Sequence, residues 1–305
     1  MPQRARSIFF RLILVPVAAL SLPACGMIKG MAINSVATTL STGSGDTFTR
    51  DDDPELIRDA SAFALKLYES LLESVPKNQE LLIATCSAFT QYGYGFVQTD
   101  ALELGDAHHD EVVALNERAL KLYVRAKNYC MRAMELRYPG IGKALMMDAE
   151  GALKKTKAKD VEMLYWTAAS WGAAISLGVD KPELVIDLPT VRALAERALA
   201  LDEKWSNGAI HEMLITLDLL PEAIGGSPAR AREHFAKATA VQQSKSPGPF
   251  VAMAAGAQNR EEFTKLLDQA LAINPDDDPS HRLVTLITQR RARALKTQID
   301  TRFPK

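Results

Sequence analysis

The chain has 305 residues and a formal net charge of −1, and 47% of its residues are hydrophobic. This apolar content is ample for a packed core and excludes global disorder. The near-neutral charge provides no electrostatic footprint for nucleic acid, while the length allows one large domain or two small ones.

The first 24 residues are predicted to be a signal peptide and not part of the fold. A basic segment that contains Arg4, Arg6 and Arg11 precedes an apolar run from Leu12 to Leu22. This run is shorter than the ~20 residues that span a bilayer. The run ends in Leu-Pro-Ala-Cys-Gly, which resembles a bacterial lipobox with Cys25 as the lipidated residue. Acylation of its sulfur and its new amine would anchor the protein stably. The alternative is an ordinary secretory signal with an incidental cysteine.

Residues 25–45 are predicted to be the lipidated cysteine and a flexible tether, and residues 46–305 a helical repeat domain. Order is expected from Asp51, because Asp53 is a good N-cap and Pro54 suits the first helical position. A similar start at Pro279 predicts a last helix that ends near Ile299. Both starts follow three aspartates, but neither has the glycine and glutamate of a calcium loop, so helix capping is favoured.

No segment alternates with period two for long enough to predict a strand, whereas helical periodicity is widespread. In the first helix it predicts that one face carries four apolar residues: Phe63, Leu67, Leu71 and Leu72. In the last helix it predicts an inner face of Leu283, Leu286, Ile287 and Leu295, and an outer face of Arg290, Arg291 and Arg293.

Two cysteines follow Cys25 in the chain, Cys86 and Cys130. Export would permit a disulfide between them. Neither has a CxxC partner or a histidine at metal spacing, and both lie in apolar helical patterns. This pattern favours buried free thiols.

A short phrase centred on a small alanine recurs along the chain, at Ala119, Ala133, Ala198, Ala238 and Ala270. The spacing is 40 residues from Ala198 to Ala238 and 32 from Ala238 to Ala270, close to the tetratricopeptide period of ~34. In that repeat a small alanine allows two helices to approach closely. The sequence therefore predicts an all-α, tetratricopeptide-like helical array whose repeats are degenerate and interrupted.

Several tracts resemble the T component associated with tripartite ATP-independent periplasmic (TRAP) transporters. They are Asp-Asp-Asp-Pro-Glu-Leu (51–56), Ala-Phe-Thr-Gln-Tyr (88–92), Tyr-Trp-Thr-Ala-Ala-Ser-Trp-Gly-Ala-Ala (165–174), Gly-Ala-Ile-His-Glu (208–212) and Gly-Gly-Ser (225–227) followed by Ala-Arg-Glu-His-Phe (231–235). The resemblance covers the chain from the lipobox to the C-terminus, and the tract from Tyr165 is the most specific.

The resemblance implies a homotrimeric periplasmic lipoprotein that associates with the substrate-binding P component and can hold or pass a small organic ligand. Gly26 after the lipidated cysteine suggests sorting to the inner leaflet of the outer membrane. The competing hypothesis is a general envelope scaffold for protein–protein interaction without a ligand role. No catalytic motif, metal site or cofactor site is expected, so an enzyme is not predicted.

The strongest candidate for ligand contact is the glycine-interrupted segment 91–98, where Gln91, Tyr94 and Gln98 would share one helical face. Two glycines inside a helix cost about 1 kcal/mol each relative to alanine, so close packing or close approach of a ligand should offset them. The same choice between packing and ligand lining applies to Trp166 and Trp171. His211 begins a zinc-protease-like pattern but lacks the second histidine, which favours a structural role.

Overall fold

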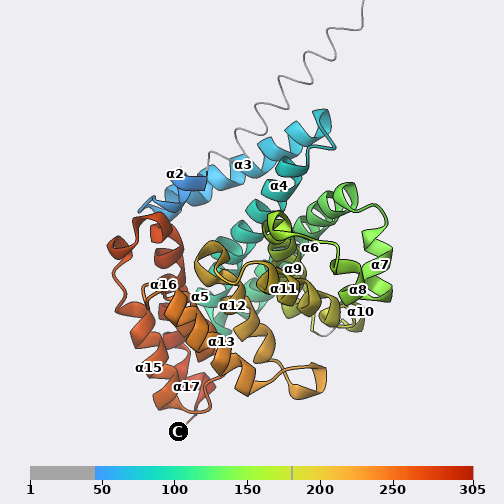
Figure 1. The fold of residues 1–305 in the computed structure, drawn as a ribbon. Coiled ribbons are helices and arrows are strands. Elements are labelled where there is room, and N and C mark those ends of the chain that lie inside the picture. The colour runs from blue at the N-terminus through green and yellow to red at the C-terminus, as the bar shows by residue number, and fades with distance from the viewer. Residues whose placement is uncertain (1–44, 180, 305) are drawn as a thin grey trace, which may run out of the picture.

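The structure is a computed structural model that describes residues 45–179 and 181–304. Within these ranges every regular element is a helix, which confirms the predicted all-α class (Figure 1). Cys25, the signal peptide and the tether up to residue 44 lie outside the described residues, so lipidation stays a prediction.

The N-terminal part runs from a short helix to the longest one. Its elements are α2 (Gly45–Thr49), α3 (Pro54–Ser74), α4 (Gln79–Tyr92), the π-helix η1 (Gly93–Val97), α5 (Gln98–Leu104), the 3-10 turn η2 (Asp106–His108) and α6 (His109–Arg137). Asp53 caps α3 as predicted, because its Oδ1 accepts hydrogen bonds from the backbone N–H groups of Glu55 and Leu56 at 3.1 and 3.0 Å.

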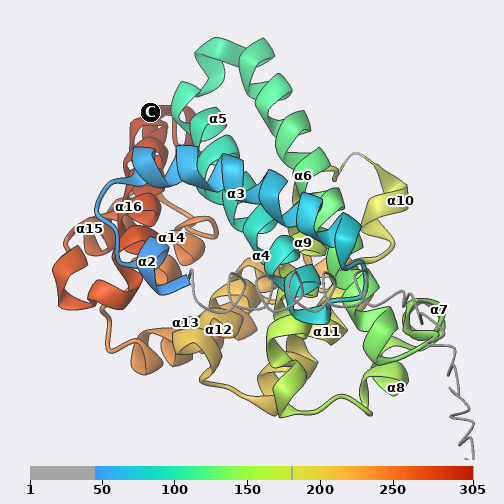
Figure 2. The ribbon, with the colours of Figure 1, turned by 90° about the horizontal axis from the view of Figure 1, so that it is seen from above.

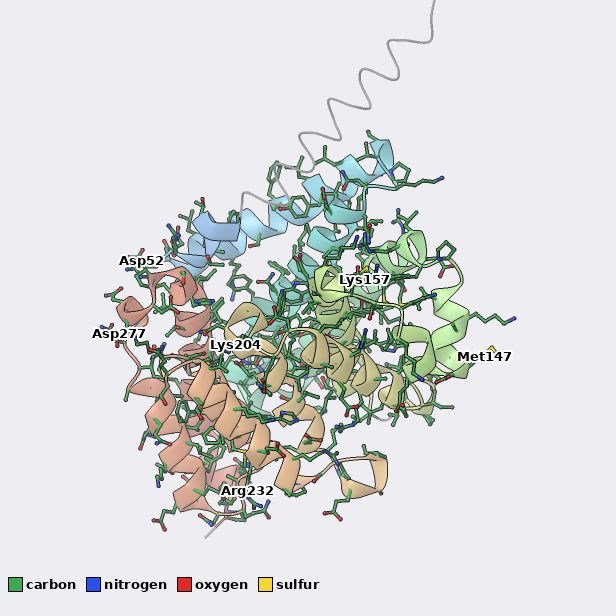
Figure 3. The ribbon with its side chains drawn as sticks, in the orientation of Figure 1. Asp52, Met147, Lys157, Lys204, Arg232 and Asp277 are labelled. Atoms are coloured by element: carbon green, nitrogen blue, oxygen red, sulfur yellow. A yellow bond between two sulfur atoms is a disulfide. The ribbon has the colours of Figure 1, made fainter. Side chains whose placement is uncertain are left out.

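The middle of the chain forms most of the largest hydrophobic core together with α4 and α6. Its elements are α7 (Ile141–Met147), α8 (Ala149–Leu153), η3 (Ala158–Asp160), α9 (Val161–Leu177), α10 (Pro182–Val185), α11 (Leu188–Leu201) and α12 (Trp205–Asp218). Leu81, Leu164 and Leu194 are fully buried in this core. Met147, in contrast, projects from the edge of the molecule in Figure 3.

The C-terminal helices surround a second core that contains Phe263 and Leu267. The elements here are η4 (Glu222–Ile224), α13 (Pro228–Val241), α14 (Gly248–Ala254), α15 (Arg260–Leu271), η5 (Pro275–Asp277), η6 (Pro279–His281), α16 (Arg282–Thr297) and α17 (Ile299–Arg302). The last long helix therefore begins three residues later than predicted. Asp278 does not cap its backbone but accepts hydrogen bonds from the side chains of Ser280 and His281.

The five alanines of the recurring phrase are all fully buried. They lie on α6, α11, α13 and α15, and α13 and α15 pack against α12 and α14, the helices that precede them. A small side chain at each position permits the close helix contact that the phrase predicts. Their grouping into tetratricopeptide-like units stays a prediction.

The two ends of the array meet, since α16 packs against α2, α3 and α5 (Figures 1 and 2). The prediction that Arg290 and Arg291 lie on an outer face is wrong, and only Arg293 is exposed. Arg290 is half-buried and pairs with Glu103 of α5 at 2.5 Å and with Asp100 at 3.1 Å. The periodicity of α16 identified its apolar face but could not show that acidic residues of α5 face its basic side.

Phe63 is 72% exposed, so the apolar face predicted for α3 is not the face that the helix buries at this position. The buried side chains of α3 are Ile57, Leu65 and Leu72. Phe63 follows Ile57 by six residues, which turns it about 240° around the helix and away from the core.

Cys86 and Cys130 form a disulfide between α4 and α6, with their Cα atoms 5.5 Å apart. The prediction of free thiols is therefore wrong. Both residues are fully buried, as the apolar patterns indicated. The pairing depends on how α4 crosses α6, which sequence periodicity does not reveal.

Candidate functional site

A tyrosine and a carboxyl group lie deep in the helical array without being fully buried. Tyr165 is on α9 and Glu212 on α12. Burial raises the pKa of the Tyr165 phenol, and the nearby Glu212 and Tyr94 raise it further. Both Tyr165 and Glu212 nevertheless keep part of their surface accessible. We call Tyr94, Tyr165, Glu212 and Arg291 the central cluster.

Glu212 is the titratable group of this cluster. Burial raises its pKa to about 7, against a smaller opposing effect of its contact with Gln242. Gln242 Nε2 lies 3.5 Å from Glu212 Oε2, whereas Gln242 Oε1 is buried without a hydrogen-bond partner. Glu212 is thus partly protonated at neutral pH, and its carboxyl group can donate or accept a hydrogen bond.

Gly248, the first residue of α14, lies directly against the Glu212 carboxyl and has no side chain to displace it. A Cβ at this position would lie 2.0 Å from Glu212 Oε1, which is an impossible contact. A side chain at position 248 would therefore displace the Glu212 carboxyl from its present place.

Arg291 of α16 covers the aromatic ring of Tyr94. Its guanidinium carbon lies 3.9 Å from the ring centroid, and its Nη1 donates to the carbonyl oxygen of Tyr94 at 3.2 Å and to Thr99 Oγ1 at 3.0 Å. Tyr94 remains 44% exposed. A planar cation held on an aromatic ring can bind a carboxylate or stack on a flat ligand.

The glycine-interrupted segment adopts a π-helix, η1, between α4 and α5. Gly93 lies against the ring of Tyr123 in α6, where a Cβ would come within 2.9 Å of Tyr123 Cε1. Tyr123 donates its hydroxyl hydrogen to Gln98 Oε1 at 2.8 Å. Close helix packing therefore accounts for Gly93. Of the three predicted residues, Gln91 is exposed, Gln98 is held by Tyr123, and only Tyr94 belongs to the central cluster.

The two glycines of η1 are expected to respond differently to alanine. Gly93→Ala forces Tyr123 to move and should cost ~1–3 kcal/mol of unfolding free energy. Gly95→Ala meets only ordinary contact with Ile287 at 3.4 Å and should be neutral or stabilising by up to ~1 kcal/mol. Urea denaturation of the two variants checks this. Equal effects would show that Gly93 is not constrained by Tyr123.

The two predicted tryptophans occupy different environments. Trp166 is half-buried, and its ring packs edge-on against Tyr165 with centroids 4.9 Å apart. Trp171 is buried, and its Nε1 donates to Asp187 Oδ2 at 3.2 Å. The structure therefore places Trp166 beside the central cluster and Trp171 in the packed core. Whether either contacts a ligand stays a prediction.

His211 is fully buried and takes part in a polar network between α12 and α13. Its Nδ1 lies 2.9 Å from Nδ1 of His234, and its Nε2 lies 3.2 Å from Glu203 Oε1. His234 Nε2 is 3.7 Å from Asp218 Oδ2. Two protonated rings would place N–H groups head to head, so the intact pair accommodates at most one imidazolium.

Stability should fall in acid because of this pair. Burial lowers the pKa of both imidazoles below the ordinary value of 6.5, and His211 lowers that of His234 further. The imidazoles of the unfolded chain therefore take up protons at a higher pH than those of the folded chain. As a result, the free energy of unfolding decreases as the pH drops below 6.5, and it becomes constant only when the pH is below the folded-state pKa.

The control for this pH dependence must allow for Glu212. Because its pKa is raised from 4.5 to about 7, Glu212 increases the free energy of unfolding as the pH falls through this range, which opposes the effect of the histidines. Denaturation midpoints are therefore compared between wild type and His234→Gln, which share Glu212. The wild type should lose more stability than the variant between pH 7 and pH 5. Parallel profiles would contradict the role of the pair.

Three members of the central cluster, Tyr165, Glu212 and Arg291, were not singled out as candidates from the sequence. Tyr165 begins the most specific of the family-like tracts, and Glu212 directly follows His211. Their convergence comes from α9, α12 and α16, which are far apart in the chain. No short-range motif could have indicated it.

The described residues contain no group of three or more His, Cys, Asp or Glu side chains placed to hold a metal ion. In the same part of the chain, no helix is long and apolar enough to cross a membrane.

Comparison with known proteins shows which family the chain resembles over most of its length. The family described as TRAP transporter T-component matches residues 50–303. A protein of Treponema pallidum (strain Nichols), described as uncharacterized, is 31% identical over 268 residues, which cover 84% of this chain and 82% of the relative. The match includes every helix from α3 to α17.

Proposed function

Since the chain belongs to the family of TRAP transporter T-components, we propose that it is a lipid-anchored periplasmic scaffold that docks the solute-binding P component and holds or passes a small organic ligand. The family is one of transporter components, so the chain acts at the cell envelope. The proposed role is binding and not catalysis.

The central cluster is the observation that supports a ligand role. It combines a carboxyl group with a pKa of about 7, a phenol and a guanidinium, and each of its residues keeps part of its surface accessible. A few polar groups among aromatic side chains are typical of small-molecule sites, where they orient the ligand. Tyr94 and Trp166, both predicted from the sequence, lie at this cluster or beside it.

The proposed location rests on the lipobox and on the disulfide. Disulfides persist in oxidising compartments such as the periplasm and are rare in the cytosol. Lipidation of Cys25 would then hold the domain at the membrane, at the inner leaflet of the outer membrane if Gly26 directs sorting.

Docking can be tested with the P component of the same transporter and the full chain carrying Cys25→Ser. Light scattering and calorimetry should show a homotrimer that binds the P component, while a solute-binding protein of an unrelated transporter should not bind. A lack of binding to the cognate P component would contradict the proposal and favour a general envelope scaffold.

A further inference from the structure

A row of basic side chains follows the outer face of α6. It consists of Arg118, Lys121, Arg125 and Arg132, at spacings of 3, 4 and 7 residues that keep all four within about 60° of the helix circumference. We call these residues the basic stripe. It extends for about 21 Å along the helix axis.

Three aromatic rings hold the arginines of the stripe in place. Arg118 lies over Tyr92, Arg125 over Phe89 and Arg132 over Tyr129, with guanidinium carbons 5.9, 5.4 and 5.4 Å from the ring centroids. Stacking restricts the side chains while it leaves N–H groups at the edges of the guanidinium planes for partners. The entropy lost when an anion binds is correspondingly small.

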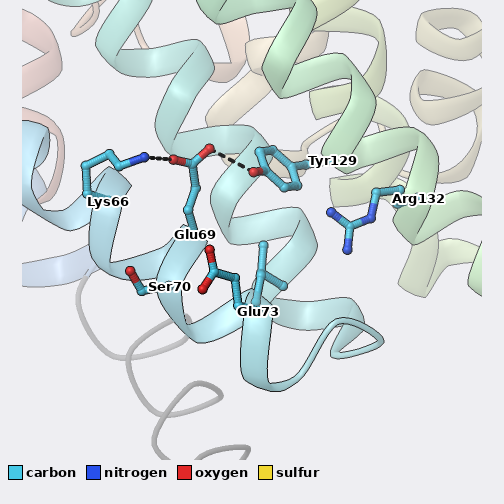
Figure 4. A pocket seen from close by; sticks show the side chains of 7 residues that line it. Lys66, Glu69, Ser70, Glu73, Tyr129 and Arg132 are labelled. Carbon is cyan, nitrogen blue, oxygen red and sulfur yellow. Dashed lines mark hydrogen bonds and ion pairs between the residues drawn. The ribbon is translucent and has the colours of Figure 1, made fainter.

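The stripe borders a hollow of about 340 Å³ on the protein surface. Its lining is Lys121, Val124, Arg125, Asn128, Tyr129 and Arg132 and contains no carboxylate. A second hollow of about 380 Å³ continues it toward α3 and shares Tyr129 and Arg132 (Figure 4).

The nearby carboxylates neutralise the stripe only in part. Glu69 accepts hydrogen bonds from Lys66 at 2.5 Å and from the hydroxyl of Tyr129 at 2.8 Å, and it lies 3.4 Å from Arg125 Nε. Glu73 lines the second hollow, and Glu117 is exposed on α6. The whole chain has a net charge of −1, so this local excess of cations is not a property of the overall surface.

We propose that the basic stripe binds an acidic peptide segment of a protein partner. A length of 21 Å fits about six residues of extended chain, whose carboxylates on one face can meet successive cations. The hollow form of the surface and its single aliphatic side chain, Val124, favour a peptide over a flat membrane surface. The inference goes beyond the proposed function, because it depends neither on the central cluster nor on the identity of the P component.

The test uses fluorescein-labelled hexaglutamate as the probe and the full chain carrying Cys25→Ser. Fluorescence polarisation should show binding that weakens as salt rises, and none of a hexaglutamine peptide. R118Q/K121Q removes two cations of the stripe, for neither of which the structure shows an ion pair, and should weaken binding about fivefold. The matched control R232Q/K265Q removes two exposed cations on α13 and α15 (Arg232 is labelled in Figure 3) and should leave binding unchanged.

Equal weakening by the two double variants, or equal binding of hexaglutamine, would overturn the proposal. Vesicles of phosphatidylglycerol provide the other arm of the test. Vesicle binding that is lost in R118Q/K121Q, without any binding of hexaglutamate, would also overturn it and assign the stripe to anionic lipid. Melting curves of both variants should stay close to wild type, because all four substituted side chains are exposed and the stacking of Arg118 on Tyr92 that R118Q removes lies at the surface.

Discussion

Removal of the Cys86–Cys130 disulfide is expected to lower the free energy of unfolding by about 4 kcal/mol. The bond joins residues separated by 44 positions, so it restricts the unfolded chain over a long loop. It also connects α4 to α6, whose packing positions Tyr123 against Gly93 of η1. Urea denaturation of oxidised protein and of Cys86→Ala/Cys130→Ala measures the loss.

The control is a reducing agent, which should destabilise wild type and leave the double-alanine variant unchanged. Thiol labelling of the denatured, unreduced protein should detect neither cysteine. Labelling of both would contradict the disulfide and restore the free thiols that the sequence pattern favoured.

Asp218→Ala is expected to cost ~3–5 kcal/mol, because it leaves the partly buried guanidinium of Arg192 with only the exposed Glu196, 3.8 Å away, as a counter-charge. Asp218 is fully buried, and its Oδ1 accepts hydrogen bonds from Arg192 Nη1 at 2.7 Å and Arg230 Nη2 at 2.8 Å. Arg230 can turn to solvent, but Arg192 is largely covered. The measurement is the shift in denaturation midpoint.

Asp268→Ala is the matched control, since Asp268 forms an exposed ion pair with Lys296. Its loss should cost less than about 1 kcal/mol. If both variants lost the same stability, the network around Asp218 would be no more important than a surface pair.

The sequence predicted those features that depend on local chemistry. Asp53 caps α3, as the side-chain chemistry of this residue implied. The recurring alanines are buried, as expected for small residues that allow two helices to approach closely. The lack of alternating runs correctly predicted an all-helical fold.

Features that depend on distant contacts were missed or predicted wrongly. Arg290 has the spacing of a solvent-exposed residue, but the ends of the array meet and bring Asp100 and Glu103 to it. Phe63 shares a helical face with Leu67 and Leu71, but α3 buries the side of the helix that carries Ile57, Leu65 and Leu72, and this choice depends on which neighbours α3 packs against. Successive members of the central cluster are separated by 47 to 79 positions in the sequence, so no local pattern can predict it.

Ligand transfer is the most direct test of the central claim, which is that the central cluster accepts ligand from the P component. The release of ligand from the loaded P component is measured after addition of wild type, Tyr94→Ala, Glu212→Gln or the control Arg232→Gln, with melting curves for each. We predict that wild type and Arg232→Gln accept ligand equally, while Tyr94→Ala and Glu212→Gln remain folded and accept it more slowly. Unchanged transfer by both folded cluster variants would contradict the claim.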